Sequence, residues 1–169
     1  MKYLGHITPY WNIEDFKSLE YKRAEYRGAE LIKQYLDAGH HRESVELYNY
    51  FEPNPMPDSV YQHIVPHFNY LENVGVAVNL FKPGQFVPCH SDRYDRYKEL
   101  HGLKSIEPIV RYVVMLEDGI PGQIMEIDKE LYSYWRAGDV FGWSNTISHA
   151  FYNFSTQDRY AKQITGVLQ

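Results

Sequence analysis

The chain has 169 residues, of which 44% are hydrophobic, and a formal net charge of −5. This length and composition fit one domain with a buried core and exclude a disordered chain. The acidic balance argues against a nucleic-acid partner, for which a basic surface is expected, and the lack of a long apolar run argues against a membrane span. Cys89 is the single cysteine, which excludes a disulfide framework, so we expect a soluble cytoplasmic protein.

The N-terminal third is expected to be helical. Between Asp15 and Ala38, apolar residues recur at helical spacing with charged residues between them, which predicts one amphipathic packing helix. Asn12 or the acidic pair Glu14-Asp15 would start this helix, and Gly39 would follow its end.

Two pairs of histidines in this third have to be weighed as metal ligands. His40 and His41 are adjacent and would point away from each other in a helix or a strand, which favours a solvated loop. His63 and His67 have the i, i+4 spacing of helical ligands, but Pro66 between them disrupts the turn. We therefore expect neither pair to bind a metal.

From residue 73 onward, short apolar segments alternate with turns, as expected for strands. The predicted strands cover residues 73–81, 86–90, 109–116, 123–127, 131–135, 140–143, 149–154 and 160–167. Asp128-Lys129 is predicted to turn a hairpin. The stretch from Asp92 to Gly102 is interpreted as a polar loop that either covers a substrate or is simply solvated.

Many short strands with regularly spaced turns predict a mainly β fold, a double-stranded β-helix of the jelly-roll or cupin-like type. We expect a single domain over residues 1–169, with packing helices over about 1–72 and the jelly-roll core over about 73–169. Within the helical part, residues 44–50 fit a short strand or a helical turn, and residues 59–65 fit a short helix.

The stretch His90-Ser91-Asp92 carries the first candidate metal ligands. His90 and Asp92 are two residues apart, so in an extended strand their side chains leave the same face. His149 is the candidate third ligand, which the fold would bring in. Two imidazoles and one carboxylate form the facial triad of non-haem Fe(II) oxygenases and leave other positions on the metal open. Each residue alone is better explained by packing or a turn, and zinc accepts the same donors.

Arg159 lies ten residues past His149, at the head of a predicted strand. If its side chain faces inward, the buried guanidinium needs a carboxylate, which arginine binds through two parallel hydrogen bonds. A dicarboxylate cosubstrate would supply one. The alternative is an exposed arginine that follows Gln157 and Asp158.

Several segments together resemble the Fe(II)/2-oxoglutarate-dependent dioxygenases. These segments are Phe81-Lys82-Pro83-Gly84-Gln85, His90-Ser91-Asp92, Trp135-Arg136-Ala137-Gly138-Asp139-Val140-Phe141, His149, Asn153 and Arg159. The resemblance covers roughly residues 73–167. It is strongest to the aspartyl/asparaginyl β-hydroxylase-like branch, which includes free-proline hydroxylases.

The resemblance implies a role for each candidate residue. It implies that Fe(II) is held by His90, Asp92 and His149. Arg159 would pair with the distal carboxylate of 2-oxoglutarate, Arg111 is a candidate for the cosubstrate's other carboxylate, and Asn79 for the pocket lining. O2 would take the remaining position on the metal.

One position departs from the family pattern. Many relatives have Ser or Thr two residues after the cosubstrate arginine, where this chain has Ala161. A hydroxyl would then come from Tyr112 or Thr165, or be absent. Asn153 and the turn at Gly138-Asp139 are expected to be structural and not catalytic.

The expected activity is hydroxylation of an unactivated C–H bond, and the first choice of substrate is an amino-acid side chain, free or in a peptide. A dry cavity is expected around the reaction, with aromatic walls formed by Phe86, Trp135, Phe141, Trp143 and Phe151. The alternatives are a nucleobase-directed oxygenase, against which the acidic balance argues, a non-catalytic cupin-like binding protein, and a zinc protein with the same ligands.

Overall fold

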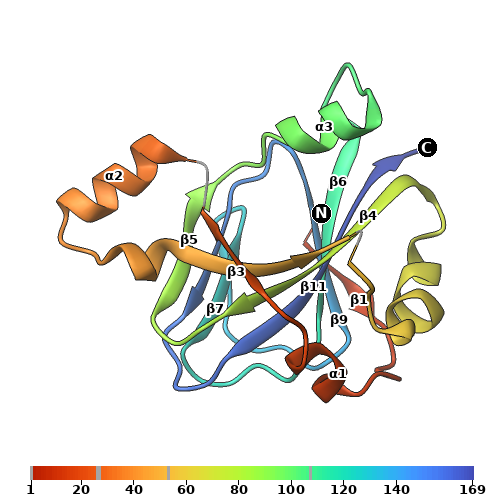
Figure 1. Ribbon diagram of the computed structural model, residues 1–169, viewed down its shortest axis with the longest axis horizontal. Coiled ribbons are helices and arrows are strands. Elements are labelled where there is room, and N and C mark those ends of the chain that lie inside the picture. The colour runs from red at the N-terminus through yellow and green to blue at the C-terminus, as the bar shows by residue number, and fades with distance from the viewer. Residues whose placement is uncertain (1, 26–27, 53, 107) are drawn as a thin grey trace.

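The computed structural model describes residues 2–25, 28–52, 54–106 and 108–169, which form two antiparallel sheets packed face to face (Figure 1). Across the larger sheet the order is β1 (Tyr3–His6), β9 (Asp139–Ser144), β6 (Ile109–Met115), β11 (Arg159–Leu168), β4 (Leu71–Phe81), β3 (Glu46–Phe51) and β2 (Lys22–Glu25). Across the smaller sheet it is β5 (Gln85–His90), β10 (His149–Asn153), β7 (Gln123–Ile127) and β8 (Glu130–Tyr132). This is the predicted double-stranded β-helix.

Short helices lie around the sheets. They are α1 (Ile13–Lys17), α2 (Ala29–Asp37), η1 (Arg42–Val45), η2 (Val60–Ile64), η3 (Val65–Phe68) and α3 (Asp95–His101). α2 lies outside the smaller sheet next to β5, whereas α3 projects at one end of the sheets (Figure 1). Within the described ranges, no helix is long and apolar enough to cross a membrane.

The single helix predicted from Asp15 to Ala38 is wrong. α1 ends at Lys17, β2 follows, and α2 begins only at Ala29, while residues 26–27 lie outside the described part of the chain. β2 pairs along its length with β3. Pairing in the sheet therefore overrides the helical spacing of the apolar residues, because propensity and spacing are weaker than tertiary contacts.

The predicted ends of that helix are still visible in the two shorter ones. Asn12 caps α1, because its side-chain oxygen accepts a hydrogen bond from the Glu14 N–H at 3.1 Å. Gly39 follows the end of α2 with a φ of +95°, a conformation that glycine adopts without strain.

The strands predicted from residue 73 onward are confirmed with small shifts at their ends, except that β8 stops at Tyr132. Asp128 and Lys129 turn the predicted hairpin with positive φ values of 52° and 66°. The loop predicted from Asp92 to Gly102 is mostly wrong, since α3 occupies residues 95–101 of this stretch.

The two uncertain segments before residue 71 also take a definite form. Residues 44–50 divide between η1 and β3. The helix predicted over residues 59–65 is present as two short turns, η2 and η3, and Pro66 lies at the start of the second. The N-terminal third thus contributes strands to the larger sheet as well as helices that cover it.

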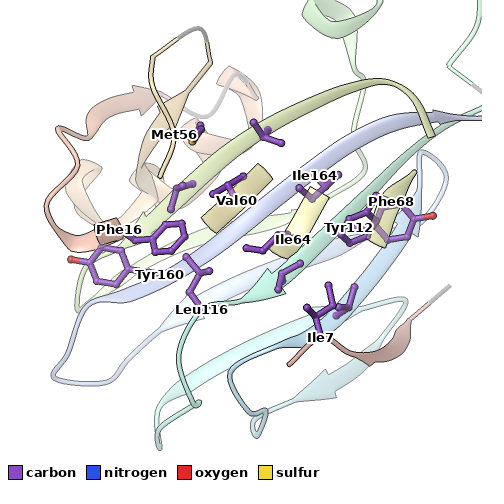
Figure 2. Close-up of a cluster of buried hydrophobic side chains, with 14 of the residues drawn as sticks. Ile7, Phe16, Met56, Val60, Ile64, Phe68, Tyr112, Leu116, Tyr160 and Ile164 are labelled. Atoms are coloured by element: carbon purple, nitrogen blue, oxygen red, sulfur yellow. The ribbon is translucent and has the colours of Figure 1, made fainter. Parts of the chain in front are cut away.

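The side chains of β11 alternate between two cores. Tyr160 and Ile164 point to the outer face of the larger sheet, where they join a cluster covered by η2 and η3 (Figure 2). Ala161 points to the opposite face and joins Phe81 and Trp143 in a second cluster between the two sheets. The candidate site lies on this inner side.

Candidate metal centre

Three candidate ligands meet between the sheets. His90 ends β5 and His149 begins β10, and the two residues are direct partners across these antiparallel strands. The Asp92 carboxylate oxygens lie 3.8 Å from the His90 Nε2 and 3.6 Å from the His149 Nε2. One possible ligand atom from each residue lies within 4.8 Å of the other two. The structure thus brings together the set that the sequence singled out.

The other ring nitrogen of each histidine contacts a backbone carbonyl. His90 Nδ1 lies 2.7 Å from the Pro88 oxygen, and His149 Nδ1 lies 3.2 Å from the Ile147 oxygen. Because a carbonyl oxygen only accepts, each Nδ1 carries the proton and each Nε2 presents a lone pair. Both Nε2 atoms lie beside Asp92. Contacts such as those of the two Nδ1 atoms fix the orientation of histidine ligands in metal sites.

The protonation states of the three residues also suit a cation. Burial lowers the pKa of His149 to about 4 and lowers the pKa of His90 as well. Burial disfavours ionisation of Asp92, but Arg111, His149 and the Trp143 N–H together hold the pKa of this carboxyl below its ordinary value. At neutral pH the imidazoles are therefore neutral and the carboxylate is charged, as metal binding requires.

A β-bulge in β5 determines which side chains face this centre. Phe151 pairs with Val87 and His149 pairs with His90, so β5 has one residue more than β10 between the two pairs. The extra residue reverses the alternation, and Phe86 packs on the outer side of the smaller sheet under α2. The expectation that Phe86 walls the cavity is wrong. The other four expected aromatic residues share the inner cluster: Trp135, Phe141, Trp143 and Phe151.

Arg111, on β6, contacts the candidate ligand Asp92. Its Nη1 donates to Asp92 Oδ1 at 2.7 Å, and its Nε donates to Thr165 Oγ1 at 3.3 Å. The guanidinium carbon lies 4.9 Å from the centre of the Tyr94 ring. Trp143 Nε1 donates to the second carboxylate oxygen, Asp92 Oδ2, at 3.0 Å. These contacts join Arg111 to the candidate ligand Asp92, and the expected role of Arg111 toward a cosubstrate carboxylate stays a prediction.

Arg159, at the start of β11, is only 3% exposed, so the alternative of a solvated arginine is wrong. Aromatic rings surround its guanidinium carbon, with centres 4.6 Å away in Trp135, 5.2 Å in Phe151 and 5.5 Å in Phe81. Burial lowers its pKa to about 9, so the group remains charged at neutral pH.

This buried charge has few polar contacts. Nη1 donates to the Ile124 carbonyl oxygen at 3.5 Å, Nη2 lies 3.8 Å from the Met115 sulfur, and Nε has no hydrogen-bond partner. Within the described part of the chain, Arg159 forms no ion pair with a carboxylate. Buried charges are normally paired, so this guanidinium has the environment of a site for an anion.

Phe151 connects Arg159 to the metal centre. Its ring lies 5.9 Å from the His149 ring and 5.8 Å from the Trp143 ring, measured between centres. The guanidinium carbon of Arg159 lies 5.2 Å from the same Phe151 ring. The guanidinium and the candidate ligands therefore share the space between the sheets.

Carboxamide side chains extend along the inner face of the larger sheet. Asn79 lies opposite Ala161 in the β4–β11 ladder, and its Nδ2 donates to Asn49 Oδ1 at 2.6 Å. Gln163 follows Ala161 on the same face of β11. Sequence reasoning selected Asn79 but missed Asn49 and Gln163. Asn49 is the direct register partner of Asn79 across β3 and β4, a relation that appears once the register is known.

Neither Tyr112 nor Thr165 offers its hydroxyl to Arg159 in place of the missing serine or threonine at position 161. Tyr112 lies in the outer cluster, on the other face of the sheet from Arg159. Thr165 faces inward, but its Oγ1 accepts the hydrogen bond from Arg111. The direct register partners of Ala161 are Asn79 and Met115, and the Asn79 carboxamide is the polar one of the two.

Asn153 and Gly138 have the structural roles expected from the sequence. Asn153 is fully buried, and its Nδ2 donates to two backbone carbonyl oxygens at 2.7 and 2.9 Å. Gly138 has a φ of +93°, and a Cβ at this position would lie 2.0 Å from the Ile7 carbonyl oxygen. The turn before β9 therefore requires glycine.

Solved structures share the fold of this chain at low sequence identity. A prolyl-4-hydroxylase from Pseudomonas putida is 16% identical, with a TM-score of 0.51 over 93% of this chain and 97% of that one. A candidate sugar phosphate isomerase from Acidithiobacillus ferrooxidans is 11% identical, with a TM-score of 0.51 over 94% and 74%. No protein-family model matches the chain, and no curated protein matches it. The names of the two similar structures differ, so the shared fold leaves the reaction to be argued from the site.

Proposed function

We propose that this protein is an Fe(II)- and 2-oxoglutarate-dependent oxygenase that hydroxylates an unactivated C–H bond. The observation that carries the proposal is a combination within one space between the sheets. The His90–Asp92–His149 donor set lies there together with the buried guanidinium of Arg159, which lacks a carboxylate among the described residues. A protein that only binds a metal has no use for the guanidinium, because an unpaired buried charge is costly.

The donor set fits iron. Two neutral imidazole nitrogens and one carboxylate oxygen are the donors of the facial triad, which leaves positions open for other ligands. Iron with bound 2-oxoglutarate supplies the oxidising chemistry, which is the cofactor's own. Zinc has no redox chemistry and prefers a closed tetrahedral site, so metal identity separates this proposal from a structural or hydrolytic zinc site.

Arg159 fits the distal carboxylate of 2-oxoglutarate. Its unpartnered Nε and its Nη groups form the planar fork that binds a carboxylate through two hydrogen bonds. Asn79 and Ala161 form the next pair after Phe81 and Arg159 whose side chains face inward in the β4–β11 ladder. The Asn79 carboxamide can therefore line the carbon chain of the cosubstrate. The aromatic rings around the guanidinium exclude water, which strengthens the ion pair.

The proposed substrate is an amino-acid side chain, free or in a peptide. This part of the proposal rests on the resemblance of residues 73–167 to the β-hydroxylase-like dioxygenases and is in line with the name of the similar P. putida structure. The net charge of −5 favours such substrates over nucleobases in nucleic acid. We infer a single catalytic domain that works in the cytoplasm, with O2 as the second cosubstrate.

Anaerobic titration of the metal-free protein with Fe(II) and 2-oxoglutarate tests the proposal. We expect a visible charge-transfer band that requires both components and is lost in Arg159→Ala. Arg136→Ala is the matched control, because this arginine is exposed in the turn before β9. Binding of Fe(II) with no band on adding 2-oxoglutarate would overturn the oxygenase and favour a non-catalytic cupin-like binding protein.

A further inference from the structure

Arg111 belongs to a row of side chains that crosses three neighbouring strands on the inner face of the larger sheet. Thr165 on β11 is the direct register partner of Arg111 on β6, and Arg111 is the direct partner of Trp143 on β9. All three side chains therefore leave the same face of the sheet. This row lies against Asp92, which both Arg111 and Trp143 contact.

The two donors of this row hold different oxygens of one carboxylate. Arg111 Nη1 donates to Asp92 Oδ1 and Trp143 Nε1 donates to Asp92 Oδ2, at 2.7 and 3.0 Å. Two donors on two oxygens fix the plane of a carboxylate, which could otherwise rotate about its terminal bond. Each carboxylate oxygen can still accept a further bond, for example from a cation. Asp92 Oδ1 lies beside His90 Nε2, and Asp92 Oδ2 lies beside His149 Nε2.

The guanidinium of Arg111 is itself held on three sides. Its Nε is fixed by Thr165 Oγ1 and its Nη1 by Asp92, and its face lies 4.9 Å from the centre of the Tyr94 ring. Tyr94 is buried and has a left-handed backbone conformation with a φ of 53°, two residues after Asp92. A guanidinium fixed in this way is poorly placed to turn toward a second carboxylate.

We propose that Arg111 is a positioning residue for the metal ligand Asp92 and that it does not anchor the cosubstrate. Arg111 compensates the buried negative charge of Asp92 and, with Trp143, presents the carboxylate to the cation in one fixed orientation. Thr165 acts through Arg111 by fixing its Nε. This inference rests on the metal-binding half of the proposed function and is independent of 2-oxoglutarate.

Cobalt(II) titration of the metal-free protein tests the inference, because the visible spectrum of bound Co(II) reports the geometry of its ligands. We expect Arg111→Met to weaken Co(II) binding by about 10- to 100-fold, the usual effect of losing an outer-shell partner, and to change the spectrum. Thr165→Val should change the Co(II) affinity and the spectrum in the same direction as Arg111→Met, but to a smaller extent. In the Arg111→Met background, Thr165→Val should add nothing, because its effect passes through the guanidinium.

The controls separate positioning from general damage. Arg136→Met removes an exposed arginine and should leave affinity and spectrum unchanged. Arg111→Lys keeps the charge but cannot reach Asp92 and Thr165 together, so it should restore part of the affinity and not the full spectrum. This variant also keeps the test valid if Arg111→Met fails to fold, which circular dichroism would show.

Calorimetric titration of the Co(II)-loaded protein with 2-oxoglutarate tests the alternative, in which Arg111 anchors the cosubstrate. If Arg111→Met leaves Co(II) affinity and spectrum unchanged but loses 2-oxoglutarate, Arg111 is a cosubstrate anchor and the inference is overturned. If the wild type binds Co(II) but not 2-oxoglutarate, the oxygenase proposal fails while the Co(II) data still decide the role of Arg111. If the wild type binds no Co(II), both are overturned.

Discussion

Strand β11 buries two cationic side chains on opposite faces of one sheet. Arg159 faces the space between the sheets and Lys162 faces the outer core, and they are 3% and 0% exposed. Within the described residues, neither forms an ion pair. Arg159 is surrounded by aromatic rings and keeps an unpartnered Nε, whereas the Lys162 Nζ lies 3.3 Å from the Met56 sulfur, a weak acceptor.

The two cations respond differently to burial. Burial lowers the pKa of Arg159 to about 9 and the pKa of Lys162 to about 7, the latter against a small opposing effect of Glu52. Arg159 therefore keeps its charge at neutral pH, whereas Lys162 can release its proton. A buried cation that cannot lose its charge indicates a binding site for an anion. One that can lose it is a polar group that the core tolerates.

Removal of the Arg159 guanidinium should give the largest effect. We expect Arg159→Met to weaken binding of 2-oxoglutarate to the Co(II)-loaded protein by about 2–5 kcal/mol, the usual effect of truncating one member of a buried charged pair. Co(II) affinity should stay at the wild-type level, because the arginine does not contact the ligands. Isothermal titration calorimetry measures both, with Arg136→Met as the control. Equal losses of metal and 2-oxoglutarate would contradict the assigned role.

Replacement of Lys162 should stabilise the protein and leave the site intact. Lys162→Met keeps the length of the side chain and removes the amine, whose pKa burial in an apolar cluster lowers from 10.5 to about 7. We expect the free energy of unfolding at pH 7 to rise by on the order of 3 kcal/mol. Urea denaturation measures the change, and Lys33→Met on the exposed side of α2 is the control. A destabilised Lys162→Met would show that the amine is a required contact.

The pH dependence of stability distinguishes the two cations in the wild-type protein. The native pKa of Lys162, about 7, lies below its ordinary value of 10.5, so above pH 7 the unfolded state binds more protons than the native state. The free energy of unfolding should therefore rise with pH, by at most about 1.4 kcal/mol per pH unit. Between pH 7 and 8 Arg159, with a pKa of about 9, stays mostly protonated in both states and contributes little.

Denaturation at several pH values in this window, for the wild type and Lys162→Met, isolates the contribution of the lysine. The slope should be present in the wild type and absent in the variant. If the free energy of unfolding rises equally with pH in both proteins, the pH dependence comes from other groups. Lys162 would then not differ from Arg159 in the way proposed.

Addition of a hydroxyl beside Arg159 should give the smallest effect. Ala161 is the next inward-facing residue of β11 after Arg159 and is 2% exposed. Ala161→Ser would place a donor where many dioxygenases of the resembling family have one. We expect tighter binding of 2-oxoglutarate by about 0.5–1.5 kcal/mol, the net value of one hydrogen bond. Calorimetry on the Co(II)-loaded variant measures the affinity for 2-oxoglutarate. Weaker binding would mean that the Asn79 carboxamide already donates the hydrogen bond that the serine was meant to add.

The elements that could be predicted are those with a local signal. The strands after residue 73 alternate apolar residues and end in turn residues, and the hairpin at Asp128-Lys129 follows from its two turn positions. His90 and Asp92 were identifiable from their donor types and two-residue spacing, and His149 from its donor type and the resemblance to the dioxygenases. In each case the information lies within a few residues or in the side-chain chemistry itself.

The elements that could not be predicted depend on partners distant in the sequence. β2 forms inside a helical pattern because β3 is available to pair with it. Phe86 points outward because a bulge, visible only in the β5–β10 register, reverses the alternation. The contact of Arg111 with Asp92 at 2.7 Å joins two strands distant in the sequence, so the sequence alone did not show it.

α3 begins three residues after Asp92 and contributes no buried side chain to either core. The helix is joined to the sheet by Tyr97, whose hydroxyl donates a hydrogen bond to the Asn73 carbonyl oxygen at 2.5 Å. The sequence of this helix is therefore nearly free of folding constraints, although it lies next to a candidate metal ligand. An exchange of the exposed residues of this helix that keeps Tyr97 should therefore cost little stability. Under the proposed function, α3 is thus a segment whose sequence can change without rebuilding the core that holds the candidate ligands.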